Sequence, residues 1–420
     1  MERERLVLEM AREAGFDLAG LAPLGPPPAA QRFEAWLEAG RHGEMAYLVR
    51  QRERILDPRR VLGGEGTLLV LGLGHSRDAF ALPDGARVAR YAAGRDYHNL
   101  MGKRLRKLAR RLEREGLAGR TRSVVDAGPL LERSHAAHAG LGFESKAANL
   151  LHPDFGPWFF LGEILLDVEL TPTGPAAEAG PSPASSPSLG SCGTCRACLQ
   201  VCPTGALLEP GVLDARLCLS YQTIENRGTI PHELRPKLGD WAFGCDLCSE
   251  VCPLGQDAPD LAERFGVHPA LREPAQSERA LAQRTPSEPA PSEPAQSGRA
   301  LAQRTRSETG GGAGLVSWLE TTAEAFPERF RGSALQRPRR DGLARNAALV
   351  LGNRPGERGL RALLRALDSD PSALVREAAG WGLAHGHRAD AQARRALDRA
   401  LAADPAPEVR LGLRRSLEGA

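Results

Sequence analysis

Eight cysteines, all between residues 192 and 252, constrain this 420-residue chain more than any other feature. The first set has the spacing C-x2-C-x2-C-x3-C followed by proline, and comprises Cys192, Cys195, Cys198 and Cys202. The second set has the spacing C-x2-C-x3-C followed by proline, and comprises Cys245, Cys248 and Cys252. Bacterial proteins bind [4Fe-4S] clusters with this spacing, and Cys218 is the one cysteine left to complete the second set. The sequence therefore predicts two [4Fe-4S] clusters.

The last cysteine of each run is expected to ligate the other cluster, because in two-cluster ferredoxins the cysteine before the proline points to the neighbouring cubane. One predicted ligand set is Cys192, Cys195, Cys198 and Cys252. The other is Cys202, Cys218, Cys245 and Cys248. Zinc also uses paired C-x2-C knuckles and remains the alternative, although two proline-terminated runs favour clusters.

The composition favours a cytoplasmic protein without a membrane span. The amino-terminal segment, MERERLVLEMAREAG, is charged and lacks the apolar core of an export signal. The longest apolar stretch, around Thr67 to Gly74, is far shorter than the roughly 20 residues that cross a bilayer. In the cytoplasm the cysteines would be thiols available to metal. The net charge of +3 is too small to indicate a polyanionic partner by itself.

Two compositional breaks divide the chain. Residues 174–190 are rich in Pro, Ser, Ala and Gly, which predicts a linker. Residues 272–313 contain two Pro- and Ser-rich near-copies around the segment RALAQRT, too few for a solenoid, which predicts a disordered low-complexity insertion. The predicted domains are residues 1–173, the cluster module at 191–271 and a helical tail at 314–420.

The first domain mixes helical and strand patterns, which predicts an α/β or α+β fold. Helical spacing of apolar residues occurs at 2–14, 31–39 and 99–115. Strand-like runs bounded by Gly or Pro occur at 67–73, 121–125 and 159–170.

The tail contains a repeated segment. SDPSALVR at 369–376 resembles ADPAPEVR at 403–410, with Asp, Pro, Val and Arg at matching places in both, and LARNAALVLGN at 343–353 is a looser member. Asp-Pro before a helix with a regularly placed arginine is the pattern of HEAT-like helical repeats. We expect Arg376 and Arg410 to form internal ladders with the aspartates.

Two groups of polar residues are candidates for chemistry. Asp126 follows a strand-like run, where catalytic side chains commonly project, although an aspartate before Gly-Pro also forms turns. Glu132 is expected to orient a neighbouring group or to cap a helix, and not to take part in catalysis. The cluster Tyr91, Asp96, Tyr97 and His98 precedes a basic helix, so capping and cofactor contact are both open interpretations.

Several segments together resemble the epoxyqueuosine reductase family. They are YAAGRDYHNLMGKRL (91–105), VVDAGPLLERSHAAHAGLG (124–142), NLLHPDFGPWFFLGEILLDVEL (149–170), CGTCRACLQVCPTGAL (192–207), LCLSYQTIENRG (217–228), FGCDLCSEVCP (243–253) and FRGSALQRPRRDGLARNAALVLGN (330–353). The resemblance implies an α+β fold with a nitroreductase-like, cobalamin-binding α/β domain, a ferredoxin-like two-cluster module and all-α HEAT-like repeats.

The resemblance also implies the reaction. Family members use cobalamin and two [4Fe-4S] clusters to remove the epoxide oxygen of epoxyqueuosine at the wobble position of tRNA with a GUN anticodon. An acid at Asp126 with a raised pKa would then donate a proton. The expected cofactor-binding residues are Arg54, Tyr91, Asp96, Tyr97, His98, Asp126, Lys146, Ser220, Tyr221 and Gln222. A monomer and a reductant of the ferredoxin or flavodoxin type are expected.

The expected tRNA contacts are Arg337, Arg339, Arg340, Arg345 and Asn346. Three arginines within four positions repel one another unless they are solvated or face phosphates, which is why this segment predicts RNA binding.

Two other functions fit parts of the pattern. A corrinoid reductive dehalogenase would share the cobalamin domain and the crossed clusters, but such enzymes usually carry an export signal and no repeat tail. A non-catalytic electron carrier with interaction repeats would bind no corrinoid.

Overall fold

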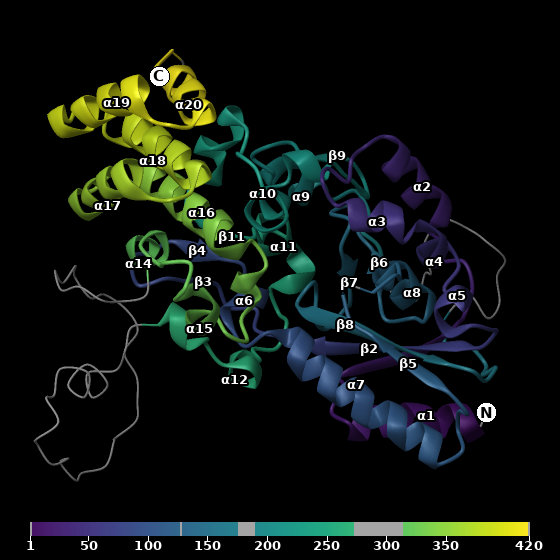
Figure 1. Ribbon diagram of the computed structural model, residues 1–420. Coiled ribbons are helices and arrows are strands. Elements are labelled where there is room, and N and C mark those ends of the chain that lie inside the picture. The colour runs from purple at the N-terminus through teal and green to yellow at the C-terminus, as the bar shows by residue number, and fades with distance from the viewer. Residues whose placement is uncertain (1, 127, 175–189, 273–313, 419–420) are drawn as a thin grey trace, which may run out of the picture.

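The computed structural model describes residues 2–126, 128–174, 190–272 and 314–418 (Figure 1). Most of the predicted linker and insertion, residues 175–189 and 273–313, lies outside the described residues. Helices and strands are mixed in the first domain, as predicted. Within the described ranges, no helix is long and apolar enough to cross a membrane.

An antiparallel sheet of four strands forms the centre of the first domain. The strand order is β1-β2-β8-β5, with bounds Leu18–Pro23, Thr67–Gly74, Phe159–Leu166 and Thr121–Val124. The runs predicted at 67–73, 121–125 and 159–170 are confirmed as strands, and the last of them ends earlier than expected, at Leu166. Every residue of β2 is buried, which identifies this strand as the middle of the core.

The two faces of the sheet are covered by different helices, α1 (Glu2–Glu13) and α7 (Tyr97–Arg114) on one and α8 (Glu132–His138) on the other. In β2 the side chains of Leu69, Leu71 and Leu73 pack toward α1 and α7, whereas those of Leu68 and Val70 pack toward α8. This alternation is the period of two that a strand buried on both faces requires. Figure 1 shows α1 and α7 lying together along one side of the sheet.

Short elements complete the first domain. The helices are α2 (Ala30–Glu38), α3 (Ala46–Arg50), α4 (Arg52–Leu56), α5 (Arg59–Leu62) and α6 (Arg90–Ala93). The strands are β3 (Phe80–Ala81), β4 (Arg87–Val88), β6 (Phe143–Glu144) and β7 (Leu150–Leu151).

The cluster module consists of short elements around the cysteine loops. The helices are α9 (Ala197–Val201), α10 (Leu219–Ile224), α11 (Leu247–Glu250) and α12 (Ala262–Phe265). The strands are β9 (Leu207–Glu209), β10 (Val212–Leu213) and β11 (Trp241–Phe243). Single 3₁₀ turns are η2 (Ala215–Leu217), η3 (His232–Leu234), η4 (Pro236–Leu238), η5 (Pro253–Gly255) and η6 (Pro269–Leu271).

The cluster module and the first domain share a three-stranded sheet of order β11-β4-β3. Side-chain hydrogen bonds join them elsewhere as well. For example, Trp158 Nε1 donates to the carbonyl oxygen of Gly255 at 3.0 Å, and Asn149 Nδ2 donates to Ser249 Oγ at 3.2 Å. One apolar cluster contains Val88 of the first domain, Phe243 of the module and much of the tail. Segments of all three predicted domains therefore contribute to one shared apolar cluster, and the module lies in the middle (Figure 1).

The tail begins with α14 (Leu315–Leu319), α15 (Phe326–Arg329) and η7 (Ala334–Gln336). Five longer helices follow: α16 (Arg339–Asn353), α17 (Glu357–Ser369), α18 (Ala373–Gly386), α19 (Ala391–Ala403) and α20 (Pro407–Glu418). The starts of α16, α18 and α20 are evenly spaced, and their spacing equals that between Asp370 and Asp404 in the sequence repeat. These three helices pack against one another in a row, and α17 and α19 cover one side. The HEAT-like assignment stays a prediction.

An arginine-aspartate ladder connects the repeats. Arg376 donates to both carboxylate oxygens of Asp404 at 2.8 and 3.0 Å, and to the carbonyl oxygen of Asp370 at 2.9 Å. Arg410 donates to the carbonyl oxygen of Asp404 in the same way. Arg340 belongs to this ladder as well, because its guanidinium binds both carboxylate oxygens of Asp370.

Replacing Arg340 by alanine is expected to lower the free energy of unfolding by about 3 kcal/mol, because Asp370 would keep a buried charge without its partner. The side chains of Arg340 and Asp370 are 12% and 5% exposed. Arg339→Ala is the matched control, since Arg339 is the exposed neighbour and surface changes stay within about 0.5 kcal/mol. Urea titration followed by circular dichroism measures both. Equal losses in the two variants would contradict the ladder.

Candidate functional site

The eight cysteines are free thiols, and their effects on one another show which of them are neighbours. Burial raises the pKa of Cys252, and the thiols of Cys192 and Cys195 raise it further. Burial likewise raises the pKa of Cys248 to about 12, with contributions from Cys218 and Cys202. These mutual effects are the ones expected if Cys252 joins the first run and Cys202 joins the second, and the crossed ligand sets stay a prediction.

Among the described residues, no group of three or more Cys, His, Asp or Glu side chains is close enough to hold one metal ion.

Lys146 lies against the first cysteine loop. Its ammonium donates to the carbonyl oxygens of Gly193 at 2.6 Å and Cys195 at 2.9 Å, and its backbone N–H donates to Cys192 Sγ at 3.5 Å. Lys146 thus supports the loop that carries three cluster ligands, and its contact with cobalamin stays a prediction.

A row of three side chains connects the start of α7 to the end of β5. His98 Nδ1 lies 2.6 Å from Asp96 Oδ1, and His98 Nε2 lies 2.9 Å from Asp126 Oδ2. Asp96 also caps α7, since its Oδ1 accepts the backbone N–H of His98 at 3.0 Å. Asp96 thus caps helix α7 and also orients the ring of His98.

The pKa values of His98 and Asp126 are shifted in opposite directions. Burial acts to raise the pKa of Asp126, but the hydrogen bond and positive charge of His98 outweigh it, so this pKa lies below its usual value. Burial acts to lower the pKa of His98, but Asp126 and Asp96 outweigh it and raise that pKa to about 9. At neutral pH the row holds its proton on His98, between two carboxylates. The raised pKa expected for Asp126 beside a corrin stays a prediction.

An aromatic wall supports the row. The ring of Tyr97 stacks on His98 with centroids 4.1 Å apart and on Phe160 at 4.1 Å with an interplanar angle of 3°. Tyr91 meets Tyr97 edge to face at 6.2 Å. Burial raises the pKa of Tyr91, and the carboxylates of Asp126 and Asp246 raise it further. Tyr91 thus lies between the Asp126 row and the second cysteine run, because Asp246 follows Cys245.

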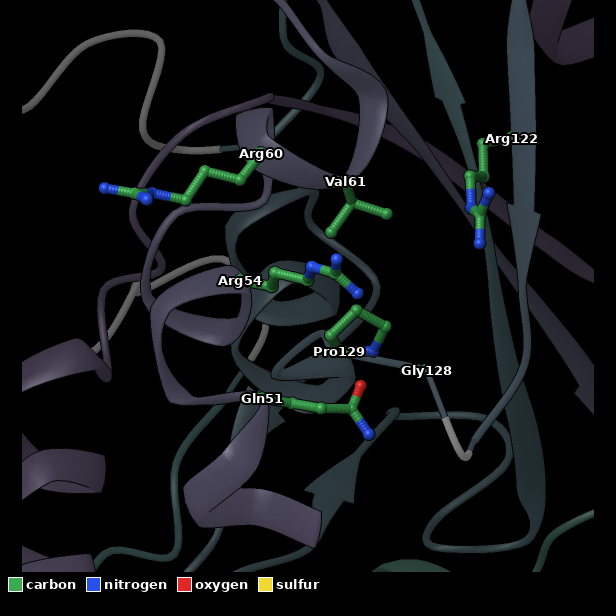
Figure 2. A pocket seen from close by; sticks show the side chains of 7 residues that line it. All are labelled: Gln51, Arg54, Arg60, Val61, Arg122, Gly128 and Pro129. Carbon is green, nitrogen blue, oxygen red and sulfur yellow. The ribbon is translucent and has the colours of Figure 1, made fainter.

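A cavity of about 380 Å³ adjoins the segment that follows Asp126. Its lining residues are Gln51, Arg54, Arg60, Val61, Arg122, Gly128 and Pro129. Figure 2 shows the side chains of Gln51 and Arg54 directed toward Pro129. Arg54, which the sequence assigned to the cofactor, therefore lies beside the loop of the predicted proton donor.

The residues after Cys218 serve packing. Tyr221 is 8% exposed and its hydroxyl accepts the backbone N–H of Glu44 at 2.7 Å. Gln222 is 3% exposed and donates to the carbonyl oxygen of Arg216. Both side chains are held in hydrogen bonds inside the protein, and their contact with cobalamin stays a prediction. Ser220 is half-buried.

Two predicted tRNA contacts are buried. Arg345 is 1% exposed and donates to the carbonyl oxygens of Gln222, Asn226 and Gly228. Asn346 is 0% exposed and donates to the carbonyl oxygens of Thr223 and Ala242. Both bind α16 to the cluster module, and Arg340 belongs to the ladder. Arg345 and Asn346 use all their side-chain donors inside the protein, which argues against RNA contacts at these two positions.

Arg337 and Arg339 remain available. Arg337 makes a bidentate ion pair with Glu225 at 2.8 and 3.0 Å and is 45% exposed, and Arg339 is exposed. Their charges lower the pKa of Arg227, after the larger effect of its burial. The charge of Arg337 also contributes to the lowered pKa of Asp126. Arg227, Arg337 and Arg339 thus form a basic group, and the charge of Arg337 reaches the Asp126 row.

Sequence reasoning missed Arg227 and Glu163. Arg227 stands alone in ENRG, where no run of charge marks it. Glu163 could have been recognised from the sequence, because it is the only charged residue of the apolar strand FFLGEILL.

Comparisons with known proteins identify relatives along the whole chain. Residues 191–255 match the family described as 4Fe-4S double cluster binding domain, and residues 56–127 match the family described as epoxyqueuosine reductase QueG, DUF1730. The first match confirms the prediction of two [4Fe-4S] clusters over the zinc alternative.

Curated relatives are similar over most of their length. An epoxyqueuosine reductase of Xanthomonas campestris pv. campestris is 36% identical over 390 residues, covering 90% of this chain and 94% of that protein. One of Pseudomonas aeruginosa is 36% identical over 90% of this chain and 92% of its own. A crystal structure of epoxyqueuosine reductase with an epoxyqueuosine-modified stem loop of tyrosine tRNA has the same fold, with a TM-score of 0.79, 23% identity and coverage of 99% and 98%.

Proposed function

Because this chain belongs to the epoxyqueuosine reductase family, and so reduces epoxyqueuosine in tRNA, we propose that the row Asp96-His98-Asp126 supplies the proton for that reduction. The observation that carries the proposal is the hydrogen bond of 2.9 Å between His98 Nε2 and Asp126 Oδ2. Removing the epoxide oxygen as water consumes two electrons and two protons. The enzyme must therefore bring an electron source and a proton source to one epoxide.

The proton source is the pair of His98 and Asp126 acting together. The imidazolium of His98 shares its proton with the exposed carboxylate of Asp126, and Asp96 holds the ring in place. When the epoxide opens, its oxygen becomes strongly basic, and the proton passes through Asp126 to that oxygen. The positive charge of His98 then disappears, and solvent can restore the proton because the side chains of both residues are partly exposed.

Electrons enter through the two clusters. The cysteines lie in the module that packs on the first domain through β11 and β4. The second cysteine run lies on the side of Tyr91, whose ring contacts Tyr97 of the aromatic wall. This continuity supports a route from the second cluster to the Asp126 row. The ultimate reductant would bind near Cys195, the most exposed of the eight cysteines.

Cobalamin is the cofactor that the sequence resemblance implies, and part of the site suits it. The guanidinium of Arg54 and the amide of Gln51 line the cavity beside Pro129, where they would hold the polar amide rim of a corrin. The cavity of about 380 Å³ would take only one edge of such a group. When bound, cobalamin supplies a low-valent cobalt that donates electrons to the epoxide.

The tRNA is held, in this proposal, by Arg227, Arg337 and Arg339. The charge of Arg337 reaches the Asp126 row, so phosphates of an anticodon loop bound by this basic group would bring a wobble base toward the acid. A base that is treated chemically must leave its stack, and loop bases do so at lower cost than paired ones.

The double variant Arg337→Gln and Arg339→Gln is expected to bind an epoxyqueuosine-containing stem loop more weakly and with a flatter salt dependence. Each phosphate contact removed should reduce the slope of log K against log salt by about 0.7 for a single strand, or by about 1.4 for two. Fluorescence anisotropy across a salt titration measures this. The matched control is Arg394→Gln with Arg395→Gln, two adjacent exposed arginines of α19. If both double variants gave the same slope of log K against log salt, the basic group would not be part of the RNA site.

The reaction itself is tested with anaerobic protein, cobalamin, a chemical reductant and the same stem loop. Nucleoside analysis after a single turnover should show queuosine in place of epoxyqueuosine. Unchanged epoxyqueuosine with both clusters intact would contradict the assigned activity.

A further inference from the structure

Glu163 is a carboxyl group buried in the middle of the central sheet. It is 0% exposed, and across the sheet its neighbours are Val70 of β2 and Val124 of β5. Neither of its carboxyl oxygens accepts a hydrogen bond from an N–H or O–H group of the described residues. An ionised carboxylate in such a place is strongly disfavoured, so the environment calls for a proton.

The group that Glu163 faces is another carboxyl. Strand alternation puts Glu163 on the face covered by α8, and Glu132 is the first residue of that helix. The two carboxyls act on each other's pKa, and two neighbouring buried carboxyls cannot both ionise, so the pair keeps at least one proton. Burial raises the pKa of Glu132 to about 7, with a contribution from the charge of Asp126. Burial and Glu132 raise the pKa of Glu163 well above its usual value.

Glu132 also contacts the backbone of the proton donor. The backbone N–H of Asp126 donates to Glu132 Oε1 at 2.7 Å. Asp126 has a φ of +50°, which is the left-handed backbone conformation that residues other than glycine rarely adopt. The hydrogen bond to Glu132 holds the backbone at this place, and the carboxylate of Asp126 then reaches His98.

We propose that Glu132 and Glu163, sharing a proton, are positioning residues that hold Asp126 against His98. The proposal rests on the function assigned above to the Asp126 row. It explains why a carboxyl stands in the core: Glu163 keeps the side chain of Glu132 directed at the Asp126 backbone. A purely structural role would be served better by an apolar residue, since buried carboxyls cost stability.

The charged groups around the pair define how it should respond to pH. Asp126 and Glu163 act on Glu132 from the β5 end and from β8, and the positive charge of Arg133 acts on it from α8. From α7, Tyr97 also senses the charge of Glu132. As pH rises through about 7, Glu132 ionises while Glu163 keeps its proton. The charged carboxylate is the stronger acceptor for the Asp126 N–H, so the single-turnover rate should rise with pH there.

Four measurements on the cluster-loaded protein test the pair, with Glu163→Leu and Glu163→Gln as variants. The infrared spectrum of the wild-type protein without substrate should contain the C=O stretch of a buried carboxylic acid, and Glu163→Leu should lack it. Titration of His98 by nitrogen-15 NMR should give a pKa near 9 for the wild type and one at least a unit lower, closer to 6.5, in Glu163→Leu. The lower value follows because Asp126 would no longer be held against the ring.

The single-turnover rate should fall by about 10²-fold in Glu163→Leu, the loss that a misplaced catalytic group causes. Thermal unfolding of the same variant should occur at an equal or higher temperature. In Glu163→Gln the amide can still donate to Glu132, so the rate should be largely rescued and its rise near pH 7 should move to lower pH. Glu13→Gln, an exposed carboxylate at the end of α1, is the control and should change none of these readouts.

A Glu163→Leu protein with a wild-type His98 titration and rate would overturn the proposal, as would the absence of a Glu163-dependent carboxylic-acid band. Failure of the assigned reaction would look different. The wild type would then make no queuosine, while the infrared and NMR results would still decide whether the carboxyl pair holds Asp126.

Discussion

Replacing Asp126 by asparagine is expected to slow the single-turnover conversion of epoxyqueuosine to queuosine by about 10²- to 10⁴-fold, the usual contribution of a positioned acid. Asparagine keeps the size of the side chain and its hydrogen bond to His98, but it cannot pass on a proton. Nucleoside analysis at timed intervals gives the rate. Spectra of the clusters and of added cobalamin should be unchanged.

Asp154→Asn is the control for this substitution, because Asp154 is an exposed aspartate whose side chain is 82% accessible. Its rate should equal that of the wild type. A wild-type rate in Asp126→Asn would return Asp126 to the role of a turn residue.

The same pair of residues predicts the alkaline limb of the rate profile. The pKa of His98 is raised from 6.5 to about 9, so the proton is held below pH 9 and lost as pH rises through that value. The wild-type rate should therefore fall above about pH 9. Asp126→Asn removes one of the two carboxylates that raise this pKa, so its residual rate should decline at a lower pH.

Loss of any one cluster ligand is expected to abolish turnover, and the pattern of double variants should reveal how the clusters share ligands. The wild type should contain eight irons per chain, four for each cubane. Cys198→Ala with Cys252→Ala, distant in sequence but in one predicted set, should leave about four. Cys198→Ala with Cys202→Ala, nearly adjacent in sequence, should leave almost none.

Iron and sulfide analysis of anaerobically reconstituted protein separates these outcomes. Ser191→Ala, an exposed position beside Cys192, is the control and should retain the full iron content. If Cys198→Ala with Cys202→Ala kept half of the iron, each run would hold its own cluster and the crossed assignment would be wrong.

Local patterns predicted the elements of this protein well. The apolar run at 67–73 could only be a buried strand, and cysteine spacing is set by the geometry of a cubane that a short loop must surround. The Asp-Pro-Val-Arg repeat gave the interval of the tail helices, and the prediction of ladders at Arg376 and Arg410 is confirmed.

Contacts between distant segments could not be predicted in the same way. The sequence predicted a basic surface at Arg340, Arg345 and Asn346, because charged and polar side chains are normally exposed. Their partners are far away along the chain, in Asp370 and in the carbonyl groups of the cluster module. The meeting of His98 with Asp126 depends in turn on α7 and β5 packing at one end of the same sheet, which no local pattern reveals.

The shared core has a consequence for how the protein is made. The apolar cluster that includes Val88 and Phe243 also includes Leu413, so its last member is synthesised long after β11. At about 5–20 residues per second the ribosome needs roughly 10 to 35 s to pass from Phe243 to Leu413. From Cys252 onward all eight cysteines exist, and until synthesis is complete the module lacks some of the tail helices that pack against it. Iron–sulfur insertion during translation would therefore meet a module not yet packed against the tail, whereas insertion into the finished protein would meet one held on both sides. Pulse-labelled nascent chains, stalled before and after α16, would reveal which of these two orders the cell follows.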